Sequence, residues 1–227
     1  MEKRIGIFCA GDREIAPFLS MLNVDKTTEK IHLRFHEGTL DGVPVVMLYS
    51  GVGKVNAASA VQTLISTFGC TAVINAGTAG AMDVSLSVFD TVVGTEYAHH
   101  DVAPDILIGF HPWLESIWMK SDKVLLRAAE KAAEAFDRQI HFGRIATGEQ
   151  FITDAGREEI NRTLAPLSVD MESAAAAQVC YVNDVPFLSV RTITDTPGQR
   201  GIEVFEANVA RASSICAEFI RKLIHNL

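Results

Sequence analysis

Carboxylate side chains stand where several apolar segments of the sequence end. Glu14 follows the first apolar run, Glu172 opens an alanine-rich segment, and Asp195 ends a run that also contains Arg191. The carboxyl ends of parallel strands gather at one edge of an open sheet, and ligands bind there. Carboxylates in such a cleft can act as acid and base, because burial and neighbouring charges separate their protonation states. The structural alternative is a helix cap for Glu14 or Glu172 and an ion pair between Arg191 and Asp195.

Other motifs in the chain do not support a cofactor or a metal. Gly51-Val52-Gly53-Lys54 lacks the spacing of a phosphate-binding loop, and no GxGxxG segment opens a helix. No GxSxG motif of a serine hydrolase is present. His99-His100-Asp101 has no second cluster at zinc spacing, so a solvated or hydrogen-bonding loop is expected there.

Strand-like and helical segments alternate along the chain and must position these residues. Short apolar runs predict strands at Arg4–Ala10, Leu33–Leu40, Val43–Ser50, Ala72–Asn75, Asp90–Tyr97, Arg144–Gly148, Leu167–Val169 and Pro186–Thr194. Apolar residues at helical spacing predict helices at Val55–Phe68, Leu125–Phe136 with Ser121 as cap, Ala155–Arg162, Met171–Val182 and Phe205–Leu223. This alternation indicates an α/β fold with a central mixed sheet flanked by helices. We expect one domain spanning residues 1–227.

Ala98–Lys120 departs from this alternation. It contains His99, Phe110, Trp113 and Trp118 and has no clear period. Loops of this length inside a compact domain are usually functional or packed against something. We expect the region to form a lid or a subunit interface.

The composition excludes several classes of partner. Lys and Arg number 20 and Asp and Glu 28, so the formal net charge is −8, which argues against nucleic-acid binding. The stretch from Lys54 to Asp83 has no charge between its ends, but polar residues interrupt it throughout. It is therefore predicted to be a buried helix and strand rather than a membrane span. The chain opens without a signal-peptide pattern, and its four cysteines are scattered, which predicts buried, reduced thiols in a cytoplasmic protein.

Four blocks of the sequence then match a known family. Gly77–Gly80, Phe151-Ile152, Val169–Ala174 and Arg191–Asp195 resemble the purine/uridine phosphorylase superfamily. Their order and spacing are most similar to its hydrolase branch, the 5′-methylthioadenosine/S-adenosylhomocysteine nucleosidases. The resemblance runs from Arg4 to the C-terminal helix. It implies a nucleoside phosphorylase-like fold, a homodimer, a nucleoside substrate, no metal or cofactor, and a role in methionine salvage.

The resemblance also implies catalytic roles. Asp195 would protonate the departing adenine at N7, which requires burial to hold the aspartic acid neutral or sharing a proton. Glu14 would activate the attacking water from the opposite side of the sugar. Hydrolysis by these two residues would yield adenine and the free sugar.

Substrate contacts follow from the same blocks. Glu172 would accept hydrogen bonds from the ribose hydroxyls, and Met171 would pack on the sugar face. Phe151 would stack on adenine, while the backbone of Ile152 reads the adenine edge. The resemblance completes the pocket with Thr78, Arg191, Val52 and Phe205, the last two facing the 5′-substituent.

Two alternative functions stay open at this point. A phosphorylase would place an arginine at Asn75, where a neutral amide removes a strong anion contact. Gly11-Asp12-Arg13, however, resembles the glycine–aspartate loop of phosphorylases, and Arg13 is a candidate cation. A nucleoside-binding protein without turnover is the second alternative.

Two departures from the family pattern leave the 5′-group open. Asp170 stands where nucleosidases of this type more often carry glutamate, although either residue can be solvated at that point, and His99–Trp118 matches the family poorly. In the family, that region of the partner subunit helps to form the 5′-pocket. The 5′-group is therefore methylthio, homocysteinyl, deoxy, or the carboxyphenyl group of aminofutalosine.

Overall fold

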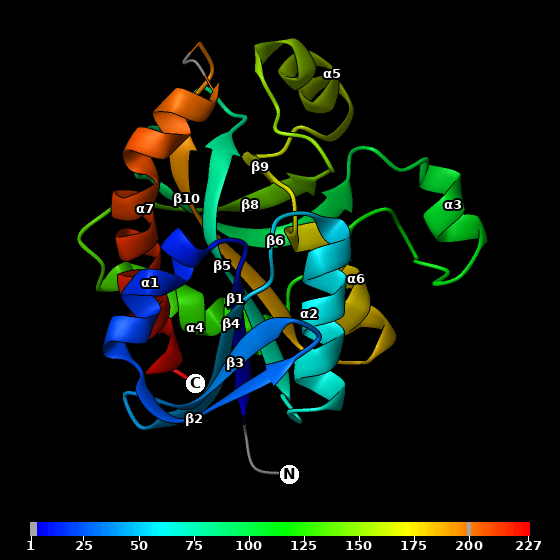
Figure 1. Cartoon of the computed structure of the whole chain (residues 1–227). Coiled ribbons are helices and arrows are strands. Elements are labelled where there is room, and N and C mark those ends of the chain that lie inside the picture. Colours follow the sequence, from blue (N-terminus) through cyan, green and yellow to red (C-terminus); the bar gives the residue numbers. More distant parts are fainter. Residues whose placement is uncertain (1–3, 199–200) are drawn as a thin grey trace.

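The computed structural model describes residues 4–198 and 201–227, which form alternating strands and helices (Figure 1). The strands are β1 (Ile5–Cys9), β2 (Asn23–Lys30), β3 (Leu33–Leu40), β4 (Val43–Tyr49), β5 (Ala72–Ala81), β6 (Thr91–His99), β7 (Met119–Lys120), β8 (Ile140–Thr147), β9 (Ser168–Asp170) and β10 (Phe187–Asp195). The helices are α1 (Asp12–Met21), α2 (Lys54–Ser66), α3 (Pro104–Gly109), α4 (Lys123–Glu134), α5 (Asp154–Leu164), α6 (Ser173–Val182) and α7 (Gly201–Ile224).

One mixed sheet runs through the described part of the chain. β1 lies between β4 and β5 and is parallel to both, while β2 and β3 extend the β4 edge in antiparallel fashion. At the other side, β10 pairs with both β5 and β6. β9 pairs with both β5 and β8, and β8 pairs with β6. These pairings close a ring of strands in the order β5, β9, β8, β6 and β10. The predicted α/β class with a central mixed sheet is confirmed.

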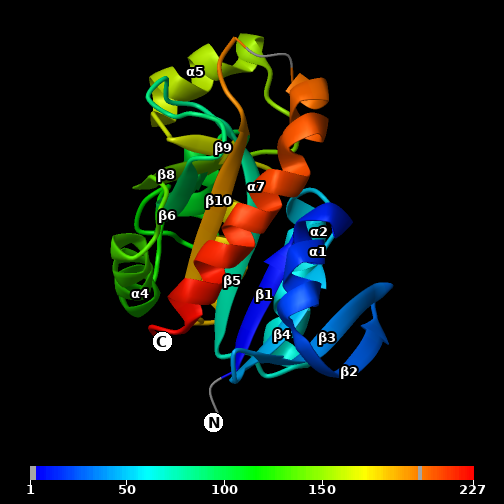
Figure 2. The same cartoon turned by 90° about the vertical axis from the view of Figure 1, so that its left-hand side faces the viewer.

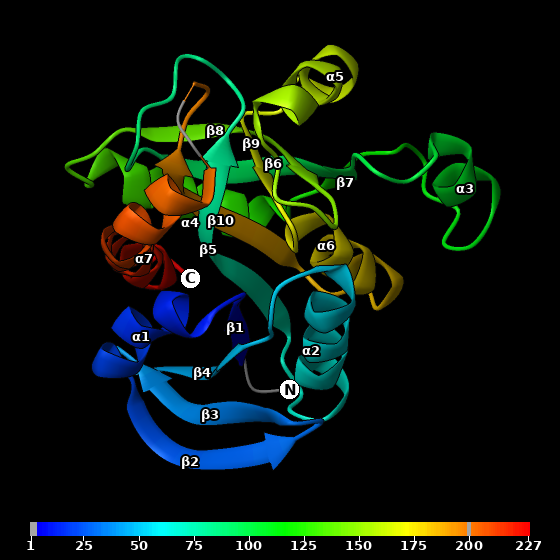
Figure 3. The same cartoon turned by 45° about the horizontal axis from the view of Figure 1, so that its top comes forward.

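Helices cover both faces of the sheet (Figure 3). On one face α1, α4 and α7 pack in a single apolar cluster that includes Ile5 and Ile7 of β1. On the other face α2 and α6 pack in a second cluster that includes Phe8. Successive residues of β1 thus enter opposite cores, which explains why its sequence reads as a continuous apolar run. Each fully buried side chain of this kind stabilises the fold by about 1.5–3 kcal/mol.

The sheet brings the carboxyl ends of several strands to one end of the molecule. Figure 2 shows α5 and the beginning of α7 at this end, beside the ends of β5 and β10, with the C-terminus at the opposite end. The charge-free stretch folds as α2 and β5, the buried helix and strand that were predicted, and the four cysteines are buried and unpaired. In the described ranges, every helix is too short or too polar to span a bilayer.

Several boundaries differ from the prediction. β5 continues to Ala81 through the glycine run instead of ending at Asn75, because β10 and β9 pair with that extension. Asp122, not Ser121, caps α4, and its side chain accepts hydrogen bonds from the backbone of Val124 and Leu125. Ser121 is instead buried. Apolar spacing did not predict α1, a short helix that begins with three charged residues, or β2, whose residues are largely polar.

The Ala98–Lys120 region leaves the body of the protein. Its helix α3 stands away from the sheet at the side of α2 and α6 (Figure 1). The region returns through β7, which pairs with β6. Ile106, Ile108, Phe110 and Trp113 of this projection are exposed. We refer to residues 104–113 as the α3 arm.

Candidate active site

A cavity of about 350 Å³ opens at the carboxyl ends of β1, β5, β9 and β10. The strand ends converge here as the sequence predicted, and loops before α5 and α6 and the start of α7 complete the wall. Arg191 lies beneath the cavity floor and is 0% exposed. The structure places the other predicted site residues in the cavity lining: Glu14, Val52, Thr78, Phe151, Ile152, Met171, Glu172, Asp195 and Phe205.

Glu14 lies on the cavity wall and is nearly buried. As the third residue of α1, it folds back so that Oε2 accepts hydrogen bonds from the backbone N–H groups of Ala10 (2.9 Å) and Gly11 (3.0 Å). Its Oε1 accepts two more from Thr78, one from the backbone N–H and one from the hydroxyl, each at 2.7 Å. Glu14 therefore caps its own helix and at the same time links the end of β1 to β5.

Glu172 lies on the cavity floor at the start of α6. Its Oε1 accepts a hydrogen bond from the backbone N–H of Gly53 at 2.9 Å, and its Oε2 faces Nη2 of Arg191 at 3.2 Å. Burial raises the pKa of Glu172 to about 7, against the opposing effect of the Arg191 cation. The carboxyl group is thus poised to change charge near neutral pH.

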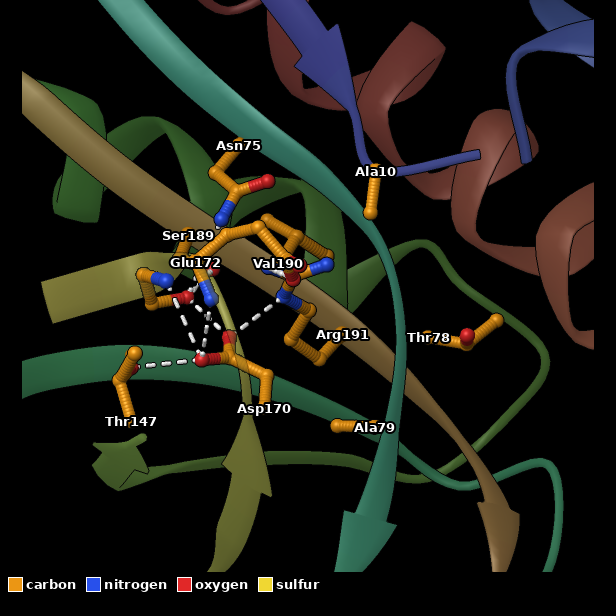
Figure 4. A network of polar contacts seen from close by, with 12 residues as sticks. Ala10, Asn75, Thr78, Ala79, Thr147, Asp170, Glu172, Ser189, Val190 and Arg191 are labelled. Carbon is orange, nitrogen blue, oxygen red and sulfur yellow. Dashed lines mark hydrogen bonds and ion pairs between the residues drawn. The ribbon is translucent and has the colours of Figure 1, made fainter. Parts of the chain in front are cut away.

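Asp170 and Arg191 form the centre of a buried polar network below the floor (Figure 4). Arg191 donates from Nε to Asp170 Oδ2 at 2.8 Å. Oδ1 of Asp170 accepts from the Thr147 hydroxyl at 2.6 Å and from the backbone of Glu172 and Ser173. Asp170 is therefore buried instead of solvated, because its carboxylate faces the buried guanidinium of Arg191.

The network fixes the charge and the position of Arg191. Burial acts to lower the pKa of Arg191, but the adjacent carboxylates of Asp170 and Glu172 outweigh that effect and raise it. Removal of one member of a buried pair typically costs about 3–5 kcal/mol, so the floor is rigid. Arg191 Nη1 is buried and has no hydrogen-bond partner among the described residues.

Asn75 occupies the position where family phosphorylases carry an arginine. Its side chain is fully buried and donates from Nδ2 to the hydroxyl of Ser173 at 3.2 Å. The neutral amide therefore belongs to the buried network and adds no positive charge to the site.

Asp195 lies at the end of β10 and is 1% exposed. Its Oδ1 accepts a hydrogen bond from the Thr194 hydroxyl at 3.0 Å, and its Oδ2 lies 2.9 Å from Nη2 of Arg157 in α5. A register shift in β10 before Asp195 separates its environment from that of Arg191. The structural alternative of an Arg191–Asp195 pair is wrong, since Arg191 pairs with Asp170 and Glu172 and Asp195 with Arg157.

The outer part of the cavity is aromatic and apolar. Phe151 and Phe205 meet edge to face with ring centroids 6.2 Å apart, and Val52 and Met171 also line the wall. Arg13 lies above Phe205, with its guanidinium carbon 5.8 Å from the ring centroid, and forms an ion pair with Glu206. At the rim of the cavity, the Arg13 side chain therefore contacts both Phe205 and Glu206.

Two of the charged residues at the site could not be identified from the sequence. Arg157 belongs to a largely polar helix whose period does not distinguish it from surface arginines. Glu206 is one of two acidic residues near the start of α7. Only the docking of α5 and α7 against the strand ends identifies them.

The segment His99-His100-Asp101 is not part of the cavity lining among the described residues. His99 hydrogen bonds to Gln178 at 3.0 Å, and Asp101 pairs with Lys54 at 2.7 Å. Within residues 4–198 and 201–227, no group of three or more potential metal-ligating side chains is assembled. The prediction of a hydrogen-bonding loop is confirmed.

Sequence comparison finds close relatives that align over nearly their whole length. The chain is 36% identical to the 5′-methylthioadenosine/S-adenosylhomocysteine nucleosidase of Anoxybacillus flavithermus, over 98% of both proteins. It is 37% identical to the nucleosidase of the same name from Psychromonas ingrahamii, over 99% of both. Both relatives are named for cleavage of the same pair of adenosine derivatives.

Solved structures of the same fold include two kinds of hydrolase. The futalosine hydrolase of Helicobacter pylori superposes with a TM-score of 0.92 at 27% identity, covering 100% of this chain and 99% of that one. The 5′-methylthioadenosine/S-adenosylhomocysteine nucleosidase of Colwellia psychrerythraea, solved with adenine, superposes with a TM-score of 0.92 at 32% identity. That match covers 100% of this chain and 96% of the other.

The family model described as the phosphorylase superfamily matches residues 4–225. The match includes every strand and the cavity, and the sequence relatives cover the same length. The family expected from the four sequence blocks is thus confirmed. This chain belongs to the phosphorylase superfamily.

Proposed function

We propose that the protein hydrolyses the N-glycosidic bond of a 5′-substituted adenosine to release adenine and the free sugar. The relatives named as nucleosidases support this reaction class. The proposed chemistry needs water, a base and an acid, and it requires no metal or organic cofactor. The unpaired cysteines fit our proposal that it acts in the cytoplasm.

The position of Glu14 is the observation that favours hydrolysis over phosphorolysis. Its carboxylate accepts hydrogen bonds from the backbone of Ala10, Gly11 and Thr78 and from the Thr78 hydroxyl. Converging donors of this kind are what a phosphate ion would use. A phosphate would meet a like charge there, and Asn75 supplies no compensating cation. Arg13, the candidate phosphate ligand, lies beside Glu206, whose carboxylate would repel a phosphate there.

We place the attacking water between Glu14 and Arg191. A methyl group built on Gly77 would lie 2.6 Å from Oε1 of Glu14 and 2.8 Å from Nη1 of Arg191, so both atoms face the same small space. Arg191 Nη1 can donate to the water oxygen while Glu14 accepts its proton. The glycine at position 77 keeps this space open.

Asp195 supplies the second proton transfer in this proposal. Bond cleavage sends the electron pair of the C–N bond to the purine, which takes up a proton at N7, while water adds to the sugar carbon. An ion pair with Arg157 stabilises the ionised carboxylate, so Asp195 must take up a proton as the purine binds. Exclusion of solvent by the bound purine would favour this neutral form.

The remaining residues position the substrate. Glu172 accepts hydrogen bonds from the ribose hydroxyls, and Met171 packs on the sugar. Phe151 stacks on adenine, and the backbone of Ile152 contacts its edge. Val52 and Phe205 then face the 5′-substituent at the outer, apolar end of the cavity.

The proposal is tested by incubation of the protein with 5′-methylthioadenosine in phosphate-free buffer. We expect release of adenine and a reducing sugar at a rate that added phosphate does not increase. Glu14→Gln and Asp195→Asn should each lower kcat by at least about 100-fold, because general acid–base catalysis contributes 10²–10⁴. Glu130→Gln, an exposed position on α4, is the matched control.

Other outcomes identify the alternatives. A strict phosphate requirement with formation of a sugar phosphate would replace hydrolysis by phosphorolysis. Binding of the nucleoside without release of adenine would identify a binding protein.

We also propose that the protein is a homodimer that associates through the α3 arm. Ile106, Ile108, Phe110 and Trp113 expose apolar surface on a segment that projects from the body. Contiguous exposed apolar surface of this kind typically marks a protein interface. A second copy is the partner we propose.

A further inference from the structure

An ion pair joins Arg13 in α1 to Glu206 in α7 at the rim of the cavity. Nη2 of Arg13 lies 2.7 Å from Oε1 of Glu206, and Nη1 contacts the second carboxylate oxygen. Both residues belong to the cavity lining. Their side chains are 46% and 49% exposed, so a ligand in the cavity can reach both charges.

The pair lies at the outer end of the site. Arg13 precedes Glu14 and Glu206 follows Phe205, and the Arg13 guanidinium lies above the Phe205 ring. Phe205 in turn meets Phe151 edge to face. The proposed function, on which this inference rests, places the 5′-substituent of the nucleoside at Val52 and Phe205. The charged pair is therefore next to the end of that substituent.

The pair contributes little to holding α1 against α7. Half-exposed ion pairs contribute about 0–1 kcal/mol. The two helices already share an apolar cluster that includes Ile15 and Phe18 of α1 and Phe219 and Ile220 of α7. Packing of these side chains explains the helix contact without the ion pair.

Both partners keep unused hydrogen-bonding capacity. A guanidinium carries five N–H donors, and the bond to Glu206 uses one on Nη1 and one on Nη2. The Nε edge of Arg13 therefore remains able to bind a second carboxylate. The Glu206 carboxylate has about four acceptor positions, of which the pair uses two. The two side chains can thus receive a carboxylate and an ammonium group side by side.

We propose that Arg13 and Glu206 form a subsite for the α-amino acid group of a homocysteinyl 5′-substituent. Arg13 binds the carboxylate, and Glu206 binds the ammonium group. A methylthio group is uncharged and gains nothing from the pair. A substituent with a carboxylate alone gains from Arg13 but is repelled by Glu206, so the pair selects a zwitterion over an anion.

The test compares three substrates: 5′-methylthioadenosine, S-adenosylhomocysteine, and an adenosine with a 5′-carboxypropylthio group, which lacks the ammonium. Values of kcat/KM are measured for the wild type, Arg13→Met and Glu206→Gln. Arg13→Met should lower the ratio of S-adenosylhomocysteine to methylthioadenosine kcat/KM by about tenfold. Glu206→Gln should lower this ratio as well, but should raise the ratio for the carboxypropylthio substrate. Losses of this size match one charge-assisted hydrogen bond.

Arg221→Met is the matched control. Arg221 also lies on α7, forms a two-contact ion pair with Asp41 and is half exposed, but it is not among the cavity-lining residues. We expect this variant to leave all three kcat/KM values unchanged. The comparison separates loss of a helix-to-surface ion pair from loss of the subsite.

Three results would overturn the inference. Equal changes for all substrates would show a structural role of the pair. Improvement of both charged substrates by Glu206→Gln would show a subsite for an anion instead of a zwitterion. Unchanged ratios in both variants would show that the pair does not contact the substituent.

Failure of the proposed function can be distinguished from failure of the subsite inference. The proposed function fails if the wild type releases no adenine from methylthioadenosine. Calorimetric binding of S-adenosylhomocysteine and methylthioadenosine to the three proteins would then still test the subsite. A tenfold weaker preference for S-adenosylhomocysteine in Arg13→Met is expected there as well.

Discussion

Three carboxylates in one cavity have different chemical surroundings. Glu14 accepts four hydrogen bonds from neutral donors, Glu172 faces a backbone N–H and a buried arginine, and Asp195 is paired with Arg157. In the proposed mechanism, these different neighbours let the same functional group act as base, hydrogen-bond acceptor and acid. The site thus divides its chemistry by environment more than by residue type.

Glu172 makes the stability of the protein depend on pH. Its pKa is raised from 4.5 to about 7 in the folded state, chiefly by burial. The folded protein therefore resists ionisation of this group. The stability that the protonated form of Glu172 provides, relative to the ionised form, is complete below about pH 4.5. It is lost as the pH rises to about 7, which lowers the free energy of unfolding by roughly 3 kcal/mol. Glu172→Gln cannot ionise, so its free energy of unfolding should fall less between pH 5 and pH 8.

Urea denaturation of both proteins at pH 5, 6, 7 and 8 measures this difference. Glu130→Gln, which removes an exposed carboxylate, should follow the wild-type curve. Parallel curves for the wild type and Glu172→Gln would contradict the link between burial of Glu172 and the pH dependence.

At the scale of elements, helices bring charges to strands that are distant in sequence. Arg157 of α5 contacts Asp195 at the end of β10. Asn161 of the same helix donates a hydrogen bond to the backbone carbonyl of Met82, which follows β5. α5 directly follows Phe151 and Ile152 in the chain. The ion pair therefore helps to hold the cavity wall that we propose to contact the purine.

Arg157→Met tests this link between α5 and β10. Removing one partner of a buried ion pair is costly, so we expect the free energy of unfolding to fall by about 3–5 kcal/mol. Asp195→Asn in the Arg157→Met background should recover part of this loss, because the buried charge that faced Arg157 is then gone as well. The KM for methylthioadenosine should also rise in Arg157→Met.

Chemical denaturation of the two single variants and the double variant gives the coupling free energy. Arg162→Met, which removes an exposed pair with Glu159 on the same helix, is the control and should change stability by less than about 1 kcal/mol. Strict additivity of Arg157→Met and Asp195→Asn would contradict the link.

At the scale of the whole molecule, the α3 arm projects from the body that the ring of strands and the two helical layers form (Figure 1). Phe110 and Trp113 are 63% and 65% exposed on this arm. The sheet and both apolar clusters are complete without them. Their surface is therefore available to a second copy of the chain.

Light scattering after size-exclusion chromatography tests the proposed dimer. We expect the wild type to have twice the chain mass of 24.7 kDa. Phe110→Glu should shift the population toward monomer, because the interface would then bury an unpaired charge. Val84→Glu, at an apolar residue that is 89% exposed in a loop, is the control and should remain dimeric. A monomeric wild type would contradict the proposal.

Much of the element pattern and the family could be predicted from local sequence. The runs of β1 and β10 and the apolar stripe of α7 have periods that specify strand or helix. α1 escaped prediction because it is short, begins with three charged residues and contains Pro17. β2 escaped because it is an exposed edge strand without an apolar period.

The sequence by itself determined which residues stand at strand ends, and therefore which carboxylates gather in the cavity. The period of apolar residues indicates the type and approximate position of most elements, and this information is local. Tertiary structure decided the partners: Asp170 with Arg191, Arg157 with Asp195, and Arg13 with Glu206. Arg13 and Glu206 are 193 residues apart, and their meeting depends on how α1 and α7 dock on the sheet. Packing of the whole core sets that docking, and no local pattern records it.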